Sequence, residues 1–462
     1  MRDALRVSML SLPINDLFAP SRALVLRAGL GGILLLIGLL QLGHRGAQRS
    51  RNDIPLWDFV SVHSATRAWL HGGNPYDRAE VIRNWHESGI FTDRDTSYFA
   101  TVYLPCSLVM IAPLAMLPAG VAMVIWLALT ILLLGLQFMA LADMAHLRWR
   151  DGGALILIGA TSASAPFQFG VLSGQLSMPA ISLCILAIWY AGRDKERLAG
   201  LLLGLACALK PQLGGPFLLY YLFLRRTKLA GTAILAAGLI CVIALAAMQL
   251  SHQSWLAGWQ GSVADTTRAG GVNDYGWTGE FRDEIVDLKM LLVSAVPAQA
   301  IRLSVGIIVA LLLVWYLRVL PRAQQRDPNT NLLVFAGLSG LILLPVYHRV
   351  YDVMLLTLGL AWALSALDGA SRKQGLALMV PMLIFLVPFD VVRTSGRRIP
   401  IVLDLSHTAW WQAIVAPHYA WGLLAVTIVI LCILTHRRNI ASRLPITPSP
   451  LHDAGWFADL RP

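Results

Sequence analysis

The run AGVAMVIWLALTILLLGLQFMALA, residues 119–142, decides the fold class of this chain. It contains no Asp, Glu, Lys or Arg, and as a helix it is long enough to cross about 30 Å of hydrocarbon. Over the whole chain 56% of residues are hydrophobic and 14% are charged, with a mean hydropathy of +0.63. A soluble core does not need so much apolar sequence, so we predict one integral membrane domain over residues 1–462.

Apolar runs similar to residues 119–142 recur along the chain, and several of them are short. The first follows Arg22 and is too long for the apolar part of a signal peptide, so we interpret it as a retained span. Together the runs predict an all-α polytopic membrane protein with about ten to twelve transmembrane helices. The remaining runs are 23–43, 153–170, 178–191, 229–250, 301–320, 331–347, 351–367, 375–391 and 419–435.

The positions of the basic residues predict the orientation in the membrane. Lys and Arg gather in segments that can all lie on one side, which is then the cytoplasm: Arg148 with Arg150, 193–197, 225–228, 318–326, Arg372 with Lys373, and Arg437 with Arg438. The same rule makes residues 1–21 and 436–462 cytoplasmic and makes 44–118 and 251–289 extracytoplasmic loops. Arg393, Arg397 and Arg398 are an exception on the outer side. The net charge of +11 is therefore a topology signal rather than a nucleic-acid footprint.

The long loop 44–118 has helical patterns of its own. Apolar residues between Trp57 and Trp69 recur at helical spacing, and Gly72-Gly73-Asn74-Pro75 ends that helix. The prolines in the apolar stretch 103–117 favour a helix that lies at the outer interface over a span. Further on, Lys210-Pro211-Gln212 interrupts residues 198–224, which predicts a broken or re-entrant helix pair.

Asp58 is the strongest candidate for chemistry, because it follows the first span in a protein that has few acids near its apolar runs. A carboxylate there can act as a general base towards a hydroxyl nucleophile. Taken alone, the position is more typical of a solvated acid in a loop than of a catalytic base.

Cationic candidates for an anion site are Lys210, at the helix break, and the pair His348 and Arg349. Half-helix ends and ammonium groups both favour phosphate. A snorkelling lysine, and a Tyr, Arg and Asp352 network that closes a hairpin, are the structural alternatives. Gln175 in a Ser-Gly-Gln turn is either a turn residue or a polar ligand.

The outer loop 251–289 is acidic and carries Trp277, whose ring can stack on a sugar or anchor at the interface. The chain has no glycine-rich nucleotide fingerprint and no His/Cys cluster, so we expect no cofactor and no metal, and we expect activity to survive chelation. Any energy must then arrive with a lipid-linked substrate.

Several of these segments resemble glycosyltransferase family 87, the polyprenyl-phosphate-mannose-dependent α-mannosyltransferases of the GT-C superclass. The resemblance rests on motifs that occur in the family's order between residues 57 and 352. They are Asp58-Phe59, Gly72-Gly73-Asn74-Pro75-Tyr76-Asp77, Tyr103-Leu104-Pro105, Ala112-Pro113-Leu114, Gly174-Gln175, Ala199-Gly200, Lys210-Pro211-Gln212 and 347–352. The family commonly has two prolines after the tyrosine, whereas this chain has Leu104 before Pro105.

The resemblance implies a GT-C fold in the inner (plasma) membrane with its active site on the extracytoplasmic side. It further implies transfer of a hexose, mannose by analogy, from a polyprenyl-phosphate sugar to a glycan or glycolipid hydroxyl, with inversion. Asp58 matches the general base, while Lys210, His348 and Arg349 would bind the donor phosphate. Supporting roles fall to Tyr76, Gln175, Gln212, Tyr351, Asp352 and Trp277. A flippase for lipid-linked saccharides and a GT-C enzyme for another sugar are the alternatives.

Overall fold

The structure is a computed structural model that describes residues 22–52, 55–88, 101–149, 151–250, 254–277, 279–320, 328–388, 404–406 and 408–441. Helices make up almost all of the regular structure in these ranges. The one β-bridge in the described part of the chain joins Ile285 to Arg349. The predicted all-α membrane class is confirmed.

Five helices of the described residues are long and apolar enough to span a membrane. A sixth span is possible if α6 and α7, which meet at a 64° bend, count as one. Most side chains on four of the five point outward, as lipid contact requires, whereas α20 is largely buried. The five are α1 (Arg22–Asn52), α5 (Ala119–Met144), α11 (Thr227–Leu250), α14 (Ala298–Val319) and α20 (His418–Ala441).

Other apolar runs form shorter helices that pack inside the bundle. The run near residues 153–170 bends at Ser164, where Pro166 begins a second helix. Such helices are α6 (Gly153–Ala163), α7 (Ala165–Ser173), α8 (Ser177–Ala191), α9 (Glu196–Leu209), α10 (Pro211–Phe223), α15 (Pro328–Leu343), α16 (Thr357–Ala366) and α17 (Arg372–Met382), with the 3₁₀ helix η5 (Val350–Leu356) before α16.

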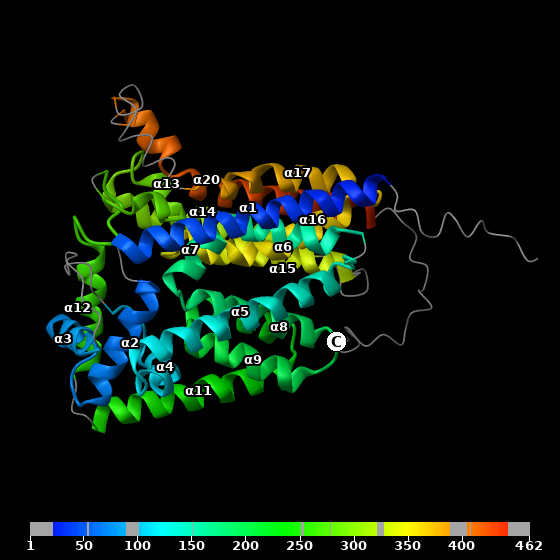
Figure 1. The fold of residues 1–462 in the computed structure, drawn as a ribbon. Helices are drawn as coiled ribbons and strands as arrows, with labels where there is room; N and C mark the ends of the chain where they lie inside the picture. The colour runs from blue at the N-terminus through cyan, green and yellow to red at the C-terminus, as the bar shows by residue number, and fades with distance from the viewer. Residues whose placement is uncertain are drawn as a thin grey trace, which may run out of the picture.

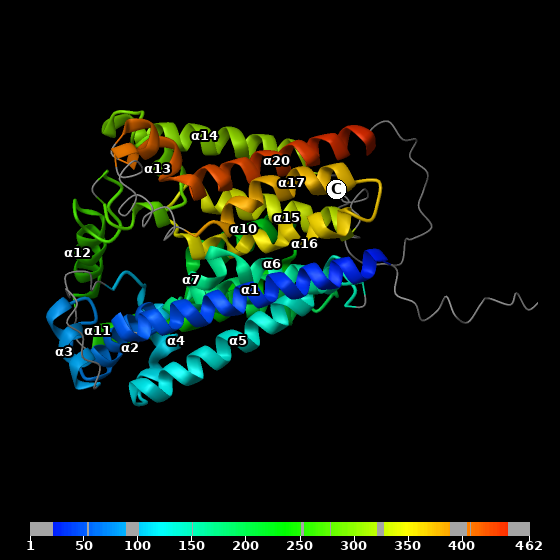
Figure 2. The same cartoon turned by 45° about the horizontal axis from the view of Figure 1, so that its top comes forward.

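The long helices run side by side in two connected groups (Figures 1 and 2). In one group α9 packs between α8 and α11, and α5 covers α8; in the other, α20 packs on α15 and α17. Helix α1 lies along α6 at very short range. A Cβ at Gly159 would come within 2.4 Å of the Gly31 carbonyl oxygen, so this contact needs glycine.

Short helices gather at one end of the bundle (Figure 1). They are α2 (Trp57–Leu70), α3 (Arg78–Glu87), α4 (Pro105–Ala115), α12 (Trp255–Thr267) and α13 (Leu288–Leu292). The prediction of a helix from Trp57 that ends before the glycine pair is confirmed, and so is the helix within 103–117. Segments 145–149 and 224–227, which carry basic residues, lie at the opposite end.

The first span is longer than the apolar run predicts, because α1 continues from residue 43 to Asn52. The polar residues of its last turns still form helix once the apolar part has nucleated it. Residues 1–21, the end of the tail from 442, and Arg393, Arg397 and Arg398 lie outside the described residues, so the topology expected for them stays a prediction.

Candidate active site

Asp58 is the second residue of α2 and is partly exposed, at the end of the bundle where the short helices gather. The chain enters the helix through Leu56, whose φ of 54° is left-handed and costs about 1 kcal/mol or more for a branched residue. The Leu56 N–H donates to the Leu172 carbonyl at 3.2 Å, and the Phe59 ring stacks on Trp126 at 5.0 Å. These contacts fix the start of α2 against the end of α7.

Gly174 brings Gln175 to Asp58. Its φ is +67°, and a Cβ there would lie 2.9 Å from the Cβ atoms of Leu56 and Phe59, so only glycine fits. The Gln175 side chain is buried, and its Nε2 donates to Asp58 Oδ2 at 3.0 Å. Its Oε1 accepts from the Tyr103 hydroxyl at 2.5 Å and from the Leu176 N–H at 2.9 Å. The amide is therefore held from both sides while it orients the carboxylate.

The pKa of the Tyr103 hydroxyl responds to the negative charges at this site. Desolvation raises the pKa of its hydroxyl well above the usual value, and the negative charges of Asp58 and Asp352 raise it further. Tyr103 therefore stays a neutral hydrogen-bond donor. Both carboxylates lie close enough to the same phenol to act on it.

Lys210 occupies the break between α9 and α10, as the sequence predicts. Its backbone, at φ −151° and ψ 84°, is extended, and Pro211 starts the next helix. The side chain is buried, and its ammonium donates to Asp352 Oδ1 at 2.8 Å and to the Ser177 hydroxyl. The ring centroid of Tyr351 lies 5.0 Å from the same Nζ atom.

Asp352 binds a second cationic candidate through its other oxygen. Nδ1 of the fully buried His348 lies 2.8 Å from Asp352 Oδ2. An ionised carboxylate only accepts, so Nδ1 carries the proton in this contact. Nε2 is buried and has no hydrogen-bond partner in the part of the chain that the structure describes. Nε2 is a donor only when the ring carries a proton on both nitrogens.

Arg349 points to other partners than its neighbour His348. Its guanidinium donates to Glu284 at 3.0 Å, to the Val272 carbonyl at 2.6 Å and to Asn273 at 3.1 Å. Tyr347 donates to the same Asn273 oxygen. These contacts hold the loop 251–289 against the segment before η5. A phosphate contact for Arg349 stays a prediction.

One short segment joins the base candidate to the cation candidate. Gln175 contacts Asp58, and Ser177, two residues later at the start of α8, contacts Lys210. Two residues of chain span roughly 7 Å at most. The Asp58 carboxylate and the Lys210 ammonium therefore contact side chains of the same three-residue segment.

Three other residues proposed from the sequence lie apart from these contacts. Tyr76 is buried, and its hydroxyl donates to the Tyr103 carbonyl at 2.8 Å, so it supports the segment that carries Tyr103. Gln212 is exposed on α10. Trp277 is half exposed, and its Nε1 donates to Ser294 at 3.3 Å. Substrate contacts for Gln212 and Trp277 stay predictions.

Sequence reasoning does not identify two residues of the cluster as site residues. In the sequence Tyr103 is noted only as part of a motif, and Ser177 is not noted at all. The signal for Ser177 is its spacing, since it follows Gln175 by two residues. Nothing in the sequence shows that the 175–177 segment meets both α2 and Lys210, because those contacts join residues more than 30 positions apart.

The described residues contain no group of three or more His, Cys, Asp or Glu side chains that could hold a metal ion. Within them, the charged groups of the site are Asp58, Asp352, Lys210 and His348 when protonated.

The fold is a helical membrane bundle, and its candidate site combines a partly exposed carboxylate with buried cationic groups, an arrangement that suits group transfer. A comparison with family models gives the class a name: residues 101–345, more than half of the chain, match glycosyltransferase family 87. The chain belongs to that family and is a membrane glycosyltransferase. The matched region includes Gln175, Ser177 and Lys210, while Asp58 and the 347–352 segment lie outside it. Comparison with curated proteins and with solved structures found no match.

Proposed function

We propose that this glycosyltransferase moves a hexose, mannose in the first instance, from a polyprenyl-phosphate sugar to a hydroxyl of a glycan or glycolipid. The proposal is supported chiefly by the contacts of the 175–177 segment: Gln175 contacts Asp58, and Ser177 contacts Lys210. An acid beside a cation is what sugar transfer from a phosphate needs, because a proton leaves the acceptor while negative charge develops on the leaving group.

Asp58 is the general base in this proposal. It takes the proton from the acceptor hydroxyl as that oxygen bonds to the anomeric carbon, and the bond from that carbon to the phosphate oxygen breaks. The Gln175 amide, which donates to Oδ2, holds the carboxylate in place. Attack opposite the leaving group inverts the anomeric configuration, so a β-linked donor gives an α-linked product.

Lys210 and His348 bind the phosphate that departs. An ammonium has three N–H donors, and Ser177 and Asp352 use two of them, which leaves one for a phosphate oxygen. His348 Nε2 adds a second donor when the ring is protonated. Asp352 keeps both cations in position, and it lowers the cost of burying their charge before the donor binds.

The location follows from the charge pattern. Asp58 lies in one of the short helices at one end of the bundle, and the basic segments 145–149 and 224–227 lie at the other end, as the positive-inside rule requires for an extracytoplasmic site. We therefore assign the active site to the outer face of the inner (plasma) membrane, where polyprenyl chains lie in the bilayer.

The test is a donor panel. Purified protein is incubated with polyprenyl-phosphate mannose, glucose and arabinose, and release of polyprenyl phosphate is followed together with formation of product. Release with mannose, and its loss in Asp58→Asn, supports the proposal. Release only with another sugar replaces mannose by that sugar. A lack of release from every donor, with lipid-linked saccharide moved across vesicles instead, would overturn the transfer proposal in favour of a flippase.

A further inference from the structure

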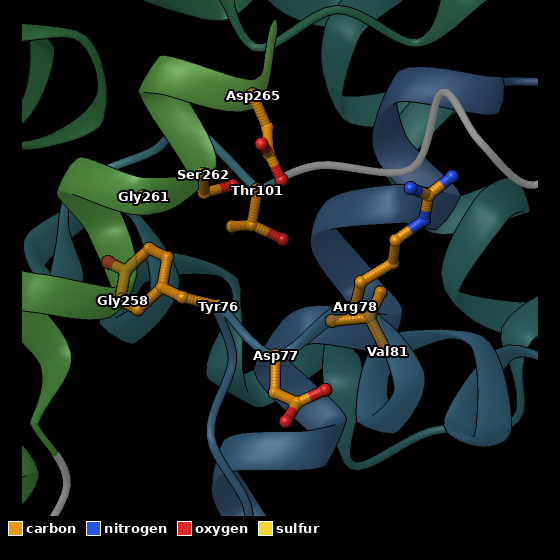
Figure 3. Close-up of a pocket in the computed structure, with 9 residues that line it drawn as sticks. All are labelled: Tyr76, Asp77, Arg78, Val81, Thr101, Gly258, Gly261, Ser262 and Asp265. Carbon is orange, nitrogen blue, oxygen red and sulfur yellow. The ribbon is translucent and has the colours of Figure 1, made fainter.

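A cavity of about 260 Å³ lies between α3 and α12, next to the segment that begins with Thr101. Figure 3 shows residues of its lining: Thr101 and Ser262 lie on one side, and Asp77 and Arg78, at the start of α3, lie on the other. Gly261 on α12 leaves space where a side chain would stand, whereas a Cβ at Gly258 would come within 3.1 Å of the Tyr76 Cβ. A Cβ at Gly261 would meet no atom within 4 Å.

The cavity is lined by a buried hydroxyl group that has no hydrogen-bond partner among the described residues. Thr101 is 3% exposed, and its Oγ1 has no hydrogen-bond partner among the residues that the structure describes. An unpaired buried hydroxyl costs about 1–3 kcal/mol. Figure 3 shows this hydroxyl directed into the cavity. A ligand hydroxyl there would remove the cost.

The charges around the cavity favour a neutral ligand with many hydroxyls. Asp77 and Asp265 both line it, against one arginine, Arg78, so a phosphate would be repelled more than attracted. Asp77 caps α3 with Oδ1 alone, by accepting from the N–H groups of Ala79 and Glu80, and this leaves Oδ2 to accept from a ligand. Carboxylate and hydroxyl acceptors beside an arginine donor match the alternating donors and acceptors of a sugar ring.

The segment 101–103 connects this cavity to the catalytic residues. Thr101 lines the cavity, while Tyr103 donates to the Gln175 side chain that holds Asp58. Two further bonds fix the segment: Trp259 of α12 donates to the Val102 carbonyl at 3.0 Å, and Tyr76 donates to the Tyr103 carbonyl at 2.8 Å. Residues 101 and 103 are at most roughly 7 Å apart along the chain.

We propose that this cavity is a saccharide subsite that binds a ring of the acceptor one or two units away from the ring whose hydroxyl is attacked. The inference rests on the proposed sugar transfer and adds to it a selection for acceptor length. An acceptor that reaches both the cavity and Asp58 gains binding energy that a monosaccharide lacks, so longer acceptors react faster at limiting concentration.

The test fills the cavity without touching the catalytic residues. Gly261→Leu places a side chain in open space on α12, and Gly306→Leu, where a Cβ also meets nothing within 4 Å on α14, is the matched control. Octyl α-mannoside and the corresponding di- and trimannosides serve as acceptors with polyprenyl-phosphate mannose. We expect Gly261→Leu to raise KM for the trimannoside about 10-fold, equivalent to one or two lost hydrogen bonds, and to leave the monosaccharide unaffected. Equal effects on all acceptors would overturn the subsite.

A binding measurement separates this inference from the proposed function. Saturation-transfer NMR with free mannotriose needs no donor and no turnover. Signal in wild type and Gly306→Leu, with loss in Gly261→Leu and a reduction in Thr101→Val, supports the subsite even if no sugar is transferred. Mannotriose signal that persists in Gly261→Leu, or that inorganic phosphate displaces, contradicts it. Transfer in wild type without an effect of acceptor length supports the enzyme and overturns the subsite.

Discussion

The Lys210 ammonium lies 2.8 Å from Oδ1 of Asp352, and the two residues are 142 positions apart in the chain. Both side chains are buried, and His348 holds the second oxygen of the same carboxylate. Two cations around one anion leave this cluster with capacity for a further negative charge when His348 is protonated. Asp352 therefore positions the two cationic side chains, and we assign the binding of phosphate to Lys210 and His348.

Replacement of Asp58 by asparagine tests the base. The new carboxamide can still pair with Gln175 but cannot take a proton, so we expect kcat to fall by about 10²–10⁴ while donor binding remains. Release of polyprenyl phosphate and equilibrium binding of the donor measure the two effects. Asp151→Asn, in the connection between α5 and α6, is the control and should keep full activity. Normal turnover of Asp58→Asn would exclude Asp58 as the base.

Replacement of Gln175 by leucine tests how the base is positioned. The change removes the hydrogen bond to the Asp58 carboxylate, and a bond to a charged group contributes about 1.5–3 kcal/mol. We expect kcat to fall roughly 10- to 100-fold with little change in KM for the donor. Gln175→Glu keeps the shape but places a second acid beside Asp58, so it should be at least as damaging. An unchanged kcat in both variants would show that the amide is not needed.

The Lys210 and Asp352 pair allows a test that separates stability from function. Lys210→Met leaves a buried carboxylate with one cation fewer and should destabilise the protein by about 3–5 kcal/mol. The double variant Lys210→Met with Asp352→Asn removes both charges, so thermal stability should recover substantially. Activity should not recover, because the phosphate has lost its ammonium. Recovery of activity in the double variant would mean that Lys210 has a structural role only.

Buried Asp287, between η3 and α13, predicts a pH dependence of the protein's stability. It is buried, accepts from the Tyr275 hydroxyl and caps α13 by accepting from the Met290 N–H. Desolvation raises the pKa of Asp287 to about 6, against these hydrogen bonds, which lower it. An unfolded aspartate titrates near roughly 3.9, so the folded state binds more protons between these values. Its contribution to stability is therefore complete below about pH 4 and is lost as the pH rises through about 6.

Thermal melting of the purified protein across that pH range measures the effect. Asp287→Asn keeps an acceptor for both hydrogen bonds but cannot ionise, so its melting temperature should fall less with rising pH than that of the wild type. Parallel curves for the two proteins would show that Asp287 does not titrate in this window.

Particular residues show how far sequence reasoning reached. The helix break at Lys210 follows from Pro211, and the end of α2 follows from the glycine pair, because both depend on local backbone chemistry. The different hydrogen-bond partners of His348 and Arg349 could not be predicted from the sequence. The two are adjacent in sequence, yet one pairs with Asp352 and the other with Glu284, 65 residues away. Spacing cannot show which distant partner packs against each side chain.

The sequence by itself determined that this protein is a helical membrane bundle, since apolar run length and the scarcity of charge leave lipid as the only suitable solvent for so many helices. It also determined which residue types stand at the helix ends and breaks. Only the tertiary structure decided that Gln175 and Ser177 join Asp58 to Lys210, that Asp352 binds two cations, and that α3 and α12 enclose a polar cavity. Those arrangements depend on contacts between segments far apart in the chain, which packing selects and local sequence does not encode.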